Sequence, residues 1–260
     1  MEVNMDNMFN DLGSLPGQAQ KQLLVSLIID ASGSMTVNGN IGRVNEAMRE
    51  VAPQLAEIEQ ENNVEILLAP IVFNNDARWV GLAPGNEPAR PSNFNWQDVA
   101  ATGGTDLASA FSLLRQKLTR RENGGWLEGR KGYRPVILLI SDGEPNVGCG
   151  WERELEELGK RGWFKVAMKY AIAVEGASMP VLEKFTGNPE TIYDTNTLRT
   201  DLATLVKALV LSVSMAVSDG TANIVDTNIP NANAEDTAQQ AIIDKVNQEI
   251  GVNNDGDFFS

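Results

Sequence analysis

The sequence predicts an α/β fold with a doubly wound, mostly parallel central sheet that carries helices on both faces and one short antiparallel edge strand. Apolar runs alternate along the chain with segments whose apolar residues recur at helical spacing, as in parallel sheets. Two runs, 23–29 and 136–140, are almost entirely apolar, which is typical of strands buried on both faces. An Asp follows each of these two runs closely, at the carboxyl edge where such sheets bind ligands.

The remaining strands follow from shorter patterns. Strands are expected at 64–73, 166–174 and 190–193, and a short edge strand near Arg78–Gly81. Pro135 precedes the run 136–140 and is compatible with a strand there, because the first residue of a strand need not donate to the ladder.

Helices are expected between nearly all of the strands. The predicted ranges are 43–61, 106–119, 151–160, 179–185 and 197–217. Pro53 lies inside the first of them and predicts a kink or a break, because proline removes one backbone donor and crowds the preceding turn.

The composition divides the chain into three parts. An N-terminal extension covers 1–19, a single domain covers 20–217, and an acidic linker and tail cover 218–260, where Lys245 is the only basic residue. Within the tail, 234–250 has apolar residues on one helical face, so it is either a short docking helix or no helix at all.

The charge and the residue types exclude several classes of function. A net charge of −14 repels phosphate backbones and anionic lipids, so neither nucleic acid nor a membrane surface is an expected partner. Cys149 is the single cysteine and histidine is absent, so a metal would need oxygen ligands. The N-terminal stretch resembles neither a secretory signal nor an anchor, and the cytoplasm is the expected compartment.

Oxygen-bearing side chains follow both central strands. Asp30, Ser32 and Ser34 lie two residues apart after the first strand, and Asp142 follows the second. Thr105 ends the segment Thr-Gly-Gly-Thr before the helix 106–119, where the glycines allow a hydroxyl to enter the same crevice. Two carboxylates and three hydroxyls suit one Mg²⁺ or Mn²⁺ ion. The ion would stay electrophilic toward an Asp or Glu carboxylate of a partner protein.

These elements, D-x-S-x-S, G-G-T and S-D-G in this order, resemble the metal-ion-dependent adhesion site of von Willebrand factor A domains, over about residues 20–217. The resemblance implies a Rossmann-like fold and direct coordination of the metal by Ser32 and Ser34. It implies direct or water-mediated coordination by Thr105, and water-mediated contact from Asp30 and Asp142.

A narrower resemblance lies within that family. The stretches IIDASGSM, IVFNNDAR, ATGGTDLASAF and YRPVILLISDGEPN are similar to the bacterial TerY-like proteins of tellurite-resistance and stress-response gene clusters. This resemblance implies an adaptor in a phosphorylation-linked system, with a PP2C-type phosphatase or a protein kinase as partner.

The loop 143–151 is expected to border the metal crevice, which makes Glu144, Asn146 and Trp151 candidates for partner selection. The alternative for Trp151 is simple packing beneath the loop.

Thr105 has an alternative role as the N-cap of the following helix, which is compatible with metal binding. The basic insertion at 120–134 predicts a solvated loop, and the alternative is a patch that docks a partner.

Three other functions are alternatives to a metal-dependent adaptor. An aspartate-dependent phosphatase would use Asp30 as nucleophile, but Ser32 stands where those enzymes carry a second Asp as general acid. No complete catalytic set is visible, so enzymatic activity is not expected. A subunit that docks onto a chelatase-type or other ATPase would use the same metal site. An adhesin is disfavoured by the lack of a signal sequence and of disulfides.

Overall fold

The computed structural model describes residues 21–61, 64–127, 131–198, 202–218, 224–226 and 232–251, and the predicted extension 1–19 lies outside them. The main sheet has seven strands in the described part. They are β1 (Lys21–Asp30), β2 (Val64–Leu68), β3 (Ile71–Phe73), β4 (Ala77–Trp79), β6 (Val136–Ser141), β7 (Met168–Ala173) and β8 (Ile192–Asp194).

The strand order is β4-β3-β1-β6-β7-β8, and β2 also pairs with β1. All pairings are parallel except that of β3 with β4, which aligns Phe73 with Ala77. The chain moves from β1 to β2 and β3 on one side and later to β6 on the other, so the strand order reverses beside β1. The predicted fold class is confirmed, including the antiparallel edge strand.

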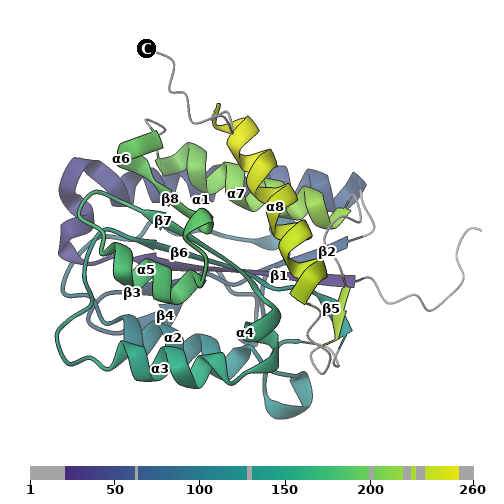
Figure 1. Ribbon diagram of the computed structural model, residues 1–260, viewed down its shortest axis with the longest axis horizontal. Coiled ribbons are helices and arrows are strands. Elements are labelled where there is room, and N and C mark those ends of the chain that lie inside the picture. The colour runs from purple at the N-terminus through teal and green to yellow at the C-terminus, as the bar shows by residue number, and fades with distance from the viewer. Residues whose placement is uncertain are drawn as a thin grey trace, which may run out of the picture.

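Helices cover both faces of the sheet (Figure 1). One face carries α1 (Asn40–Glu61), α7 (Leu202–Ser218) and α8 (Ala232–Glu249). The other carries α2 (Leu107–Lys117), α3 (Trp151–Gly159), α4 (Gly162–Val166) and α5 (Met179–Thr186). Two short helical segments, η2 (Gly33–Gly39) and α6 (Thr195–Leu198), follow β1 and β8.

The central strand β1 supplies side chains to both layers of the core. Leu23, Val25 and Leu27 belong to the cluster beneath α1 and α7, whereas Leu24 and Ile28 belong to the cluster beneath α2 and α5. Successive side chains of a strand point to opposite faces, so a strand covered on both faces needs apolar residues at nearly every position.

The prediction of one strand over 64–73 was wrong in one respect. The segment is divided into β2 and β3 at Ala69 and Pro70. Pro70 has no N–H to donate to the ladder. The Ala69 N–H still donates to the Val25 carbonyl at 3.0 Å, and the Pro70 carbonyl accepts from the Val80 N–H at 3.0 Å. Both strands therefore stay in the same sheet.

Pro53 does not break the first helix. Helix α1 runs without interruption from Asn40 to Glu61, although Pro53 cannot donate to the carbonyl of Arg49. The buried residues Val44, Met48, Val51 and Leu55 hold the helix against the sheet, and their burial outweighs the lost hydrogen bond.

The C-terminal segment forms a helix, α8, over most of 234–250, where the sequence allowed either a short docking helix or no helix. Ile242, Ile243 and Val246 of α8 are buried, and α8 packs against α7.

The single helix predicted for 197–217 is instead α6 followed by α7, with residues 199–201 outside the described part. In the described part, no helix combines the length and the apolar character needed to cross a membrane.

The insertion 120–134 is more than a solvated loop. Trp126 is buried, meets Trp79 edge to face with 4.5 Å between ring centroids, and donates from its indole nitrogen to the Asn86 carbonyl at 3.1 Å. Farther along, β5 (Lys131–Tyr133) pairs with β9 (Ile224–Asp226) in a separate antiparallel ribbon, which the sequence did not predict.

Candidate metal centre

The last residue of β1 is a fully buried carboxylate. One oxygen of Asp30 accepts the Ser32 backbone N–H at 2.8 Å, and the other accepts the Ser141 hydroxyl at 2.8 Å. Ser141 ends β6, the strand beside β1. The parallel pairing of the two strands thus places both of their carboxyl ends, and the side chains they carry, at one edge of the sheet.

A chain of hydroxyls connects the two Asp-bearing loops. The Ser34 hydroxyl donates to Asp142 at 2.9 Å and lies 2.9 Å from the Ser32 hydroxyl. Because the proton of Ser34 is directed to Asp142, Ser32 is the donor between the two serines. Both serine oxygens keep lone pairs that these hydrogen bonds do not use, so both can serve as metal ligands.

The two carboxylates lack a compensating positive charge. In the described part of the chain, neither Asp30 nor Asp142 forms an ion pair with a basic side chain. Burial raises the pKa of Asp30, against the opposing effect of its hydrogen bonds from Ser32 and Ser141. Burial also raises the pKa of Asp142, and the negative charge of Asp30 adds to that rise. A bound cation would offset both effects, because a nearby positive charge stabilises the ionised form of each carboxyl group.

The loop before α2 lies against the loop after β1. The Gly33 N–H donates to the Gly103 carbonyl at 3.0 Å, and the Thr102 N–H donates to the Ala31 carbonyl at 2.8 Å. Gly103 has a φ of +79°, a conformation that residues with a Cβ rarely adopt. These bonds bring the buried Thr105 to the same edge of the sheet as Asp30 and Asp142.

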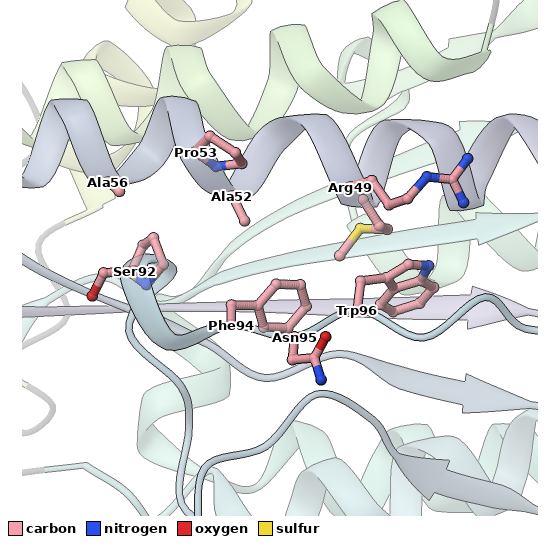
Figure 2. A pocket seen from close by; sticks show the side chains of 10 residues that line it. Arg49, Ala52, Pro53, Ala56, Ser92, Phe94, Asn95 and Trp96 are labelled. Carbon is pink, nitrogen blue, oxygen red and sulfur yellow. The ribbon is translucent and has the colours of Figure 1, made fainter.

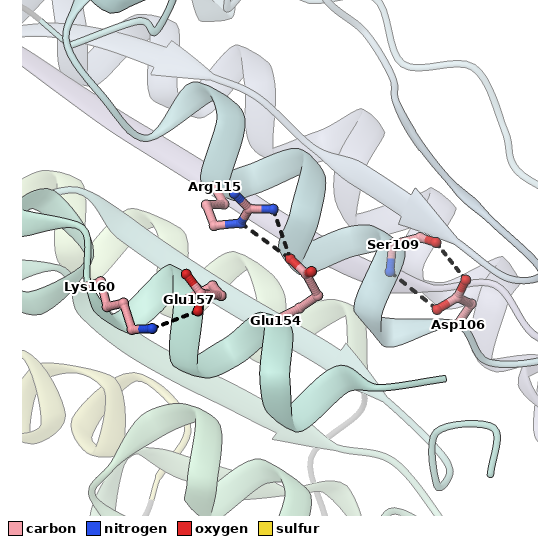
Figure 3. Close-up of polar contacts among 6 residues, drawn as sticks. All are labelled: Asp106, Ser109, Arg115, Glu154, Glu157 and Lys160. Carbon is pink, nitrogen blue, oxygen red and sulfur yellow. Dashed lines mark hydrogen bonds and ion pairs between the residues drawn. The ribbon is translucent and has the colours of Figure 1, made fainter. Parts of the chain in front are cut away.

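Thr105 is not the N-cap of the following helix. Asp106 caps α2 by accepting the Ser109 backbone N–H at 3.2 Å and the Ser109 hydroxyl at 2.5 Å (Figure 3). Farther along α2, Arg115 forms a salt bridge at 3.1 Å with Glu154 of α3. The capping alternative for Thr105 is therefore excluded, and its position stays compatible with a ligand role.

Two asparagines support the Thr105 loop. Asn75 accepts the Gly104 N–H at 2.8 Å, and Asn146 accepts the Thr105 N–H at 3.1 Å. The Asn146 backbone N–H donates in return to the Thr105 carbonyl at 2.9 Å. The sequence did not identify Asn75 or Ser141 as site residues, although Asn75 lies in IVFNNDAR and Ser141 in S-D-G.

The predicted rim residues fall into different environments. Glu144 is exposed and accepts the Ser178 hydroxyl at 3.3 Å. Asn146 is exposed but holds the Thr105 backbone. Trp151 is half-buried against the core beneath α2 and α5, with the Lys184 ammonium 5.5 Å from its ring centroid. Of these three, only Glu144 neither packs against the core nor supports the Thr105 loop. Cys149 is partly exposed in the same loop.

A hollow lies on the α1 side of the molecule. It has a volume of about 450 Å³ and lies between α1 and the segment 91–96. Figure 2 shows Phe94 and Trp96 below the helix that carries Arg49, Ala52 and Pro53. Because neither Asp30 nor Asp142 lines it, this hollow is separate from the candidate metal centre.

The candidate centre depends on hydroxyls as well as carboxylates. In the described ranges, no three Asp, Glu or Cys side chains form a group suited to a metal ion. The oxygen set of Asp30, Ser32, Ser34, Thr105 and Asp142 differs from such a group because three of its members are neutral. Two charges from the protein and several neutral oxygens are typical of Mg²⁺ sites that keep water or accept an outside ligand.

Comparisons with known structures agree with the observed fold. Proximal thread matrix protein 1 from the mussel byssus is 15% identical, with a TM-score of 0.53 over 74% of this chain and 46% of its own. The pilus adhesin SpaC from Lactobacillus rhamnosus GG is 13% identical, with a TM-score of 0.55 over 77% and 31%. A von Willebrand factor type A protein from Catenulispora acidiphila is 15% identical, with a TM-score of 0.50 over 72% and 42%.

These similarities concern the fold, and the chain matches less than half the length of each of these structures. No curated protein matches the sequence. The model of the von Willebrand factor type A domain matches residues 25–208, which include all five predicted metal ligands. The chain therefore belongs to the von Willebrand factor type A domain family.

Proposed function

We propose that this protein is a metal-dependent interaction module. Asp30, Ser32, Ser34, Thr105 and Asp142 would hold one Mg²⁺ or Mn²⁺ ion, and a carboxylate of a partner protein would complete its coordination. The ion would supply the positive charge that links the carboxylates of this chain to the carboxylate of the partner. One observation carries the proposal: two buried carboxylates lie at one sheet edge without a basic partner in the described chain.

The donor set supports this choice of metal and ligand. Mg²⁺ and Mn²⁺ prefer oxygen ligands, and the serine hydroxyls donate to neighbours while keeping lone pairs for a cation. The two carboxylates nearly balance one dication, and the neutral hydroxyls add no charge. The ion would thus remain able to bind an incoming anion.

The finer part of the proposal follows the TerY-like resemblance. The protein would act in the cytoplasm as an adaptor of a tellurite-resistance or stress-response system, with a PP2C-type phosphatase or a kinase as partner. Support comes from the four sequence stretches that carry that resemblance, three of which contain the proposed ligands. The proposal includes no enzymatic activity, because the buried site, in the described part of the chain, includes no general acid or base beyond the metal ligands.

Calorimetric titration with Mg²⁺ and Mn²⁺ tests the metal site. Ser34→Ala removes an exposed hydroxyl that is one of the proposed ligands, and saturable binding seen for the wild type should be lost. Thr36→Ala is the matched control, because Thr36 is an exposed hydroxyl residue of the same segment η2 and donates to the Gly33 carbonyl at 2.8 Å. Equal binding by both variants would contradict the proposal.

A further inference from the structure

Three large apolar side chains stand out from the surface of the described chain. They are Val37, Val147 and Met179, with 52%, 105% and 38% of their surface exposed. All three lie on segments that leave the carboxyl ends of sheet strands, after β1, β6 and β7. The exposed apolar residues therefore lie at the same edge of the sheet as the candidate metal centre.

Hydrogen bonds connect the three segments that carry these residues. Asn38, next to Val37, donates to Glu175 at 2.5 Å. Ser178, next to Met179, donates to Glu144 in the loop that carries Val147. The two bonds join the three segments into one connected rim. Val37 lies three residues after Ser34, and Val147 lies five residues after Asp142.

The backbone at the first of these positions favours exposure. Asn38 adopts a left-handed conformation with a φ of +52°, and Gly39 follows with a φ of +69°. Val37 and Asn38 thus form a kink within η2, just before α1 begins at Asn40. Val37 is therefore presented at the surface, while the preceding Met35 is buried.

The rim also carries negative charge. Glu144 and Glu175 are both exposed, and their hydrogen-bond donors are neutral side chains. In a protein with a net charge of −14, a strongly acidic partner would be repelled from this edge. A basic residue next to the carboxylate that reaches the metal would be attracted.

From this rim we infer the chemistry of the partner. It is a protein segment with a single Asp or Glu that reaches the metal, flanked by an apolar residue that covers Val147 and Met179 and by a Lys or Arg that faces Glu144 and Glu175. This inference rests on the proposed function, because the carboxylate needs the metal. It adds that the flanking residues select the partner.

Peptides of varied flanking sequence test the inference. Immobilised peptides would carry a central Asp or Asn between Leu, Ser, Lys or Glu neighbours, and binding of the full chain would be measured with Mn²⁺ or with EDTA. The Asp peptides with Leu and Lys neighbours should bind most strongly and only with Mn²⁺. The paired change Val147→Ser and Met179→Ser should weaken their binding about tenfold or more while Mn²⁺ affinity is retained.

A second variant tests the charge of the rim. Glu144→Gln with Glu175→Gln should remove the preference for Lys over Glu neighbours and leave the preference for Leu. Glu190→Gln removes an exposed charge of η5 (Pro189–Thr191), before β8 and away from the rim, and as the control it should bind like the wild type. Mn²⁺-dependent binding of all Asp peptides without regard to their neighbours would overturn this inference and leave the proposed function standing. No Mn²⁺-dependent difference between Asp and Asn peptides would overturn both.

Discussion

Asp30 is a buried carboxylate at the carboxyl end of β1. Without metal, an uncharged side chain of the same shape at this position would make the folded protein more stable. The side chain is fully buried, and burial raises its pKa. Its folded-state pKa lies above the ordinary value of 3.8, so protonation favours the folded state. The stabilisation that comes from protonating Asp30 is complete at a pH below its ordinary pKa of 3.8, and it is lost as the pH rises through the higher folded-state pKa.

Replacing this charge should stabilise the metal-free protein. We expect Asp30→Asn to raise the free energy of unfolding at pH 7 by about 1 to 3 kcal/mol in EDTA, since an amide can still pair with Ser32 and Ser141. The gain should shrink as the pH falls toward 4. Thermal unfolding in EDTA measures it, with the exposed Asp76→Asn as control. A loss of stability at pH 7 would contradict the electrostatic account.

The buried Asn45 of α1 holds the segment that leads to the Thr105 loop. Its amide donates to the Val99 carbonyl at 3.0 Å and accepts from the Val99 N–H at 3.0 Å and the Trp96 indole at 3.1 Å. Asn45→Ala leaves these buried groups unpaired and should cost about 2 to 4 kcal/mol in urea unfolding. The exposed Asn95→Ala should cost less than about 0.5 kcal/mol. Equal effects would show that the network contributes little.

At the scale of elements, α8 behaves as part of the folded core. Ile242 and Val246 are fully buried in the cluster that includes α7. We expect Ile242→Ala to lower the free energy of unfolding by about 2 to 4 kcal/mol, because it leaves a cavity between two helices. The exposed Gln240→Ala is the control. If the two variants unfold at the same urea concentration, α8 does not contribute to the stability of the domain.

The elements also show what the sequence can predict. The strands β1 and β6 were predicted because burial on both faces leaves a continuous apolar run, a signal independent of distant parts of the chain. The ribbon of β5 and β9 was missed, since its pairing joins residues 131–133 to 224–226 and neither segment has a pattern of its own. Helix α4 was missed because five residues are too few to show helical spacing.

The candidate site was partly predictable for a similar reason. The five proposed ligands stand in three short motifs. Strand order brings the Asp30 and Asp142 motifs together, and backbone hydrogen bonds to the loop after β1 add the Thr105 motif. The supporting residues Asn75 and Ser141 were missed, because their role depends on which backbone N–H or carboxylate faces them. Local sequence does not encode that geometry. The roles of all five ligands in metal binding stay a prediction.

At the scale of the whole molecule, a bound metal should stabilise the fold by an amount that grows with the logarithm of the free metal concentration. At a free Mn²⁺ concentration one hundred times the dissociation constant, we expect about 2.7 kcal/mol of added stability. The effect should diminish as the pH falls toward the ordinary carboxyl range, because protons compete with the ion for Asp30 and Asp142. Thermal unfolding with Mn²⁺ or EDTA between pH 4 and 8 measures this dependence. A stabilisation unchanged by pH would place the ion elsewhere.

The position of β1 at the centre of the sheet has a consequence for how the protein folds. Strand β1 pairs with β6, more than one hundred residues later in the chain. Such distant pairings make folding slow, because closing a long loop costs conformational entropy before the contact can stabilise the chain. The three ligand-bearing loops meet only after that pairing. Affinity for the ion should therefore arise in the last phase of refolding, and Mn²⁺ binding would report on completion of the sheet.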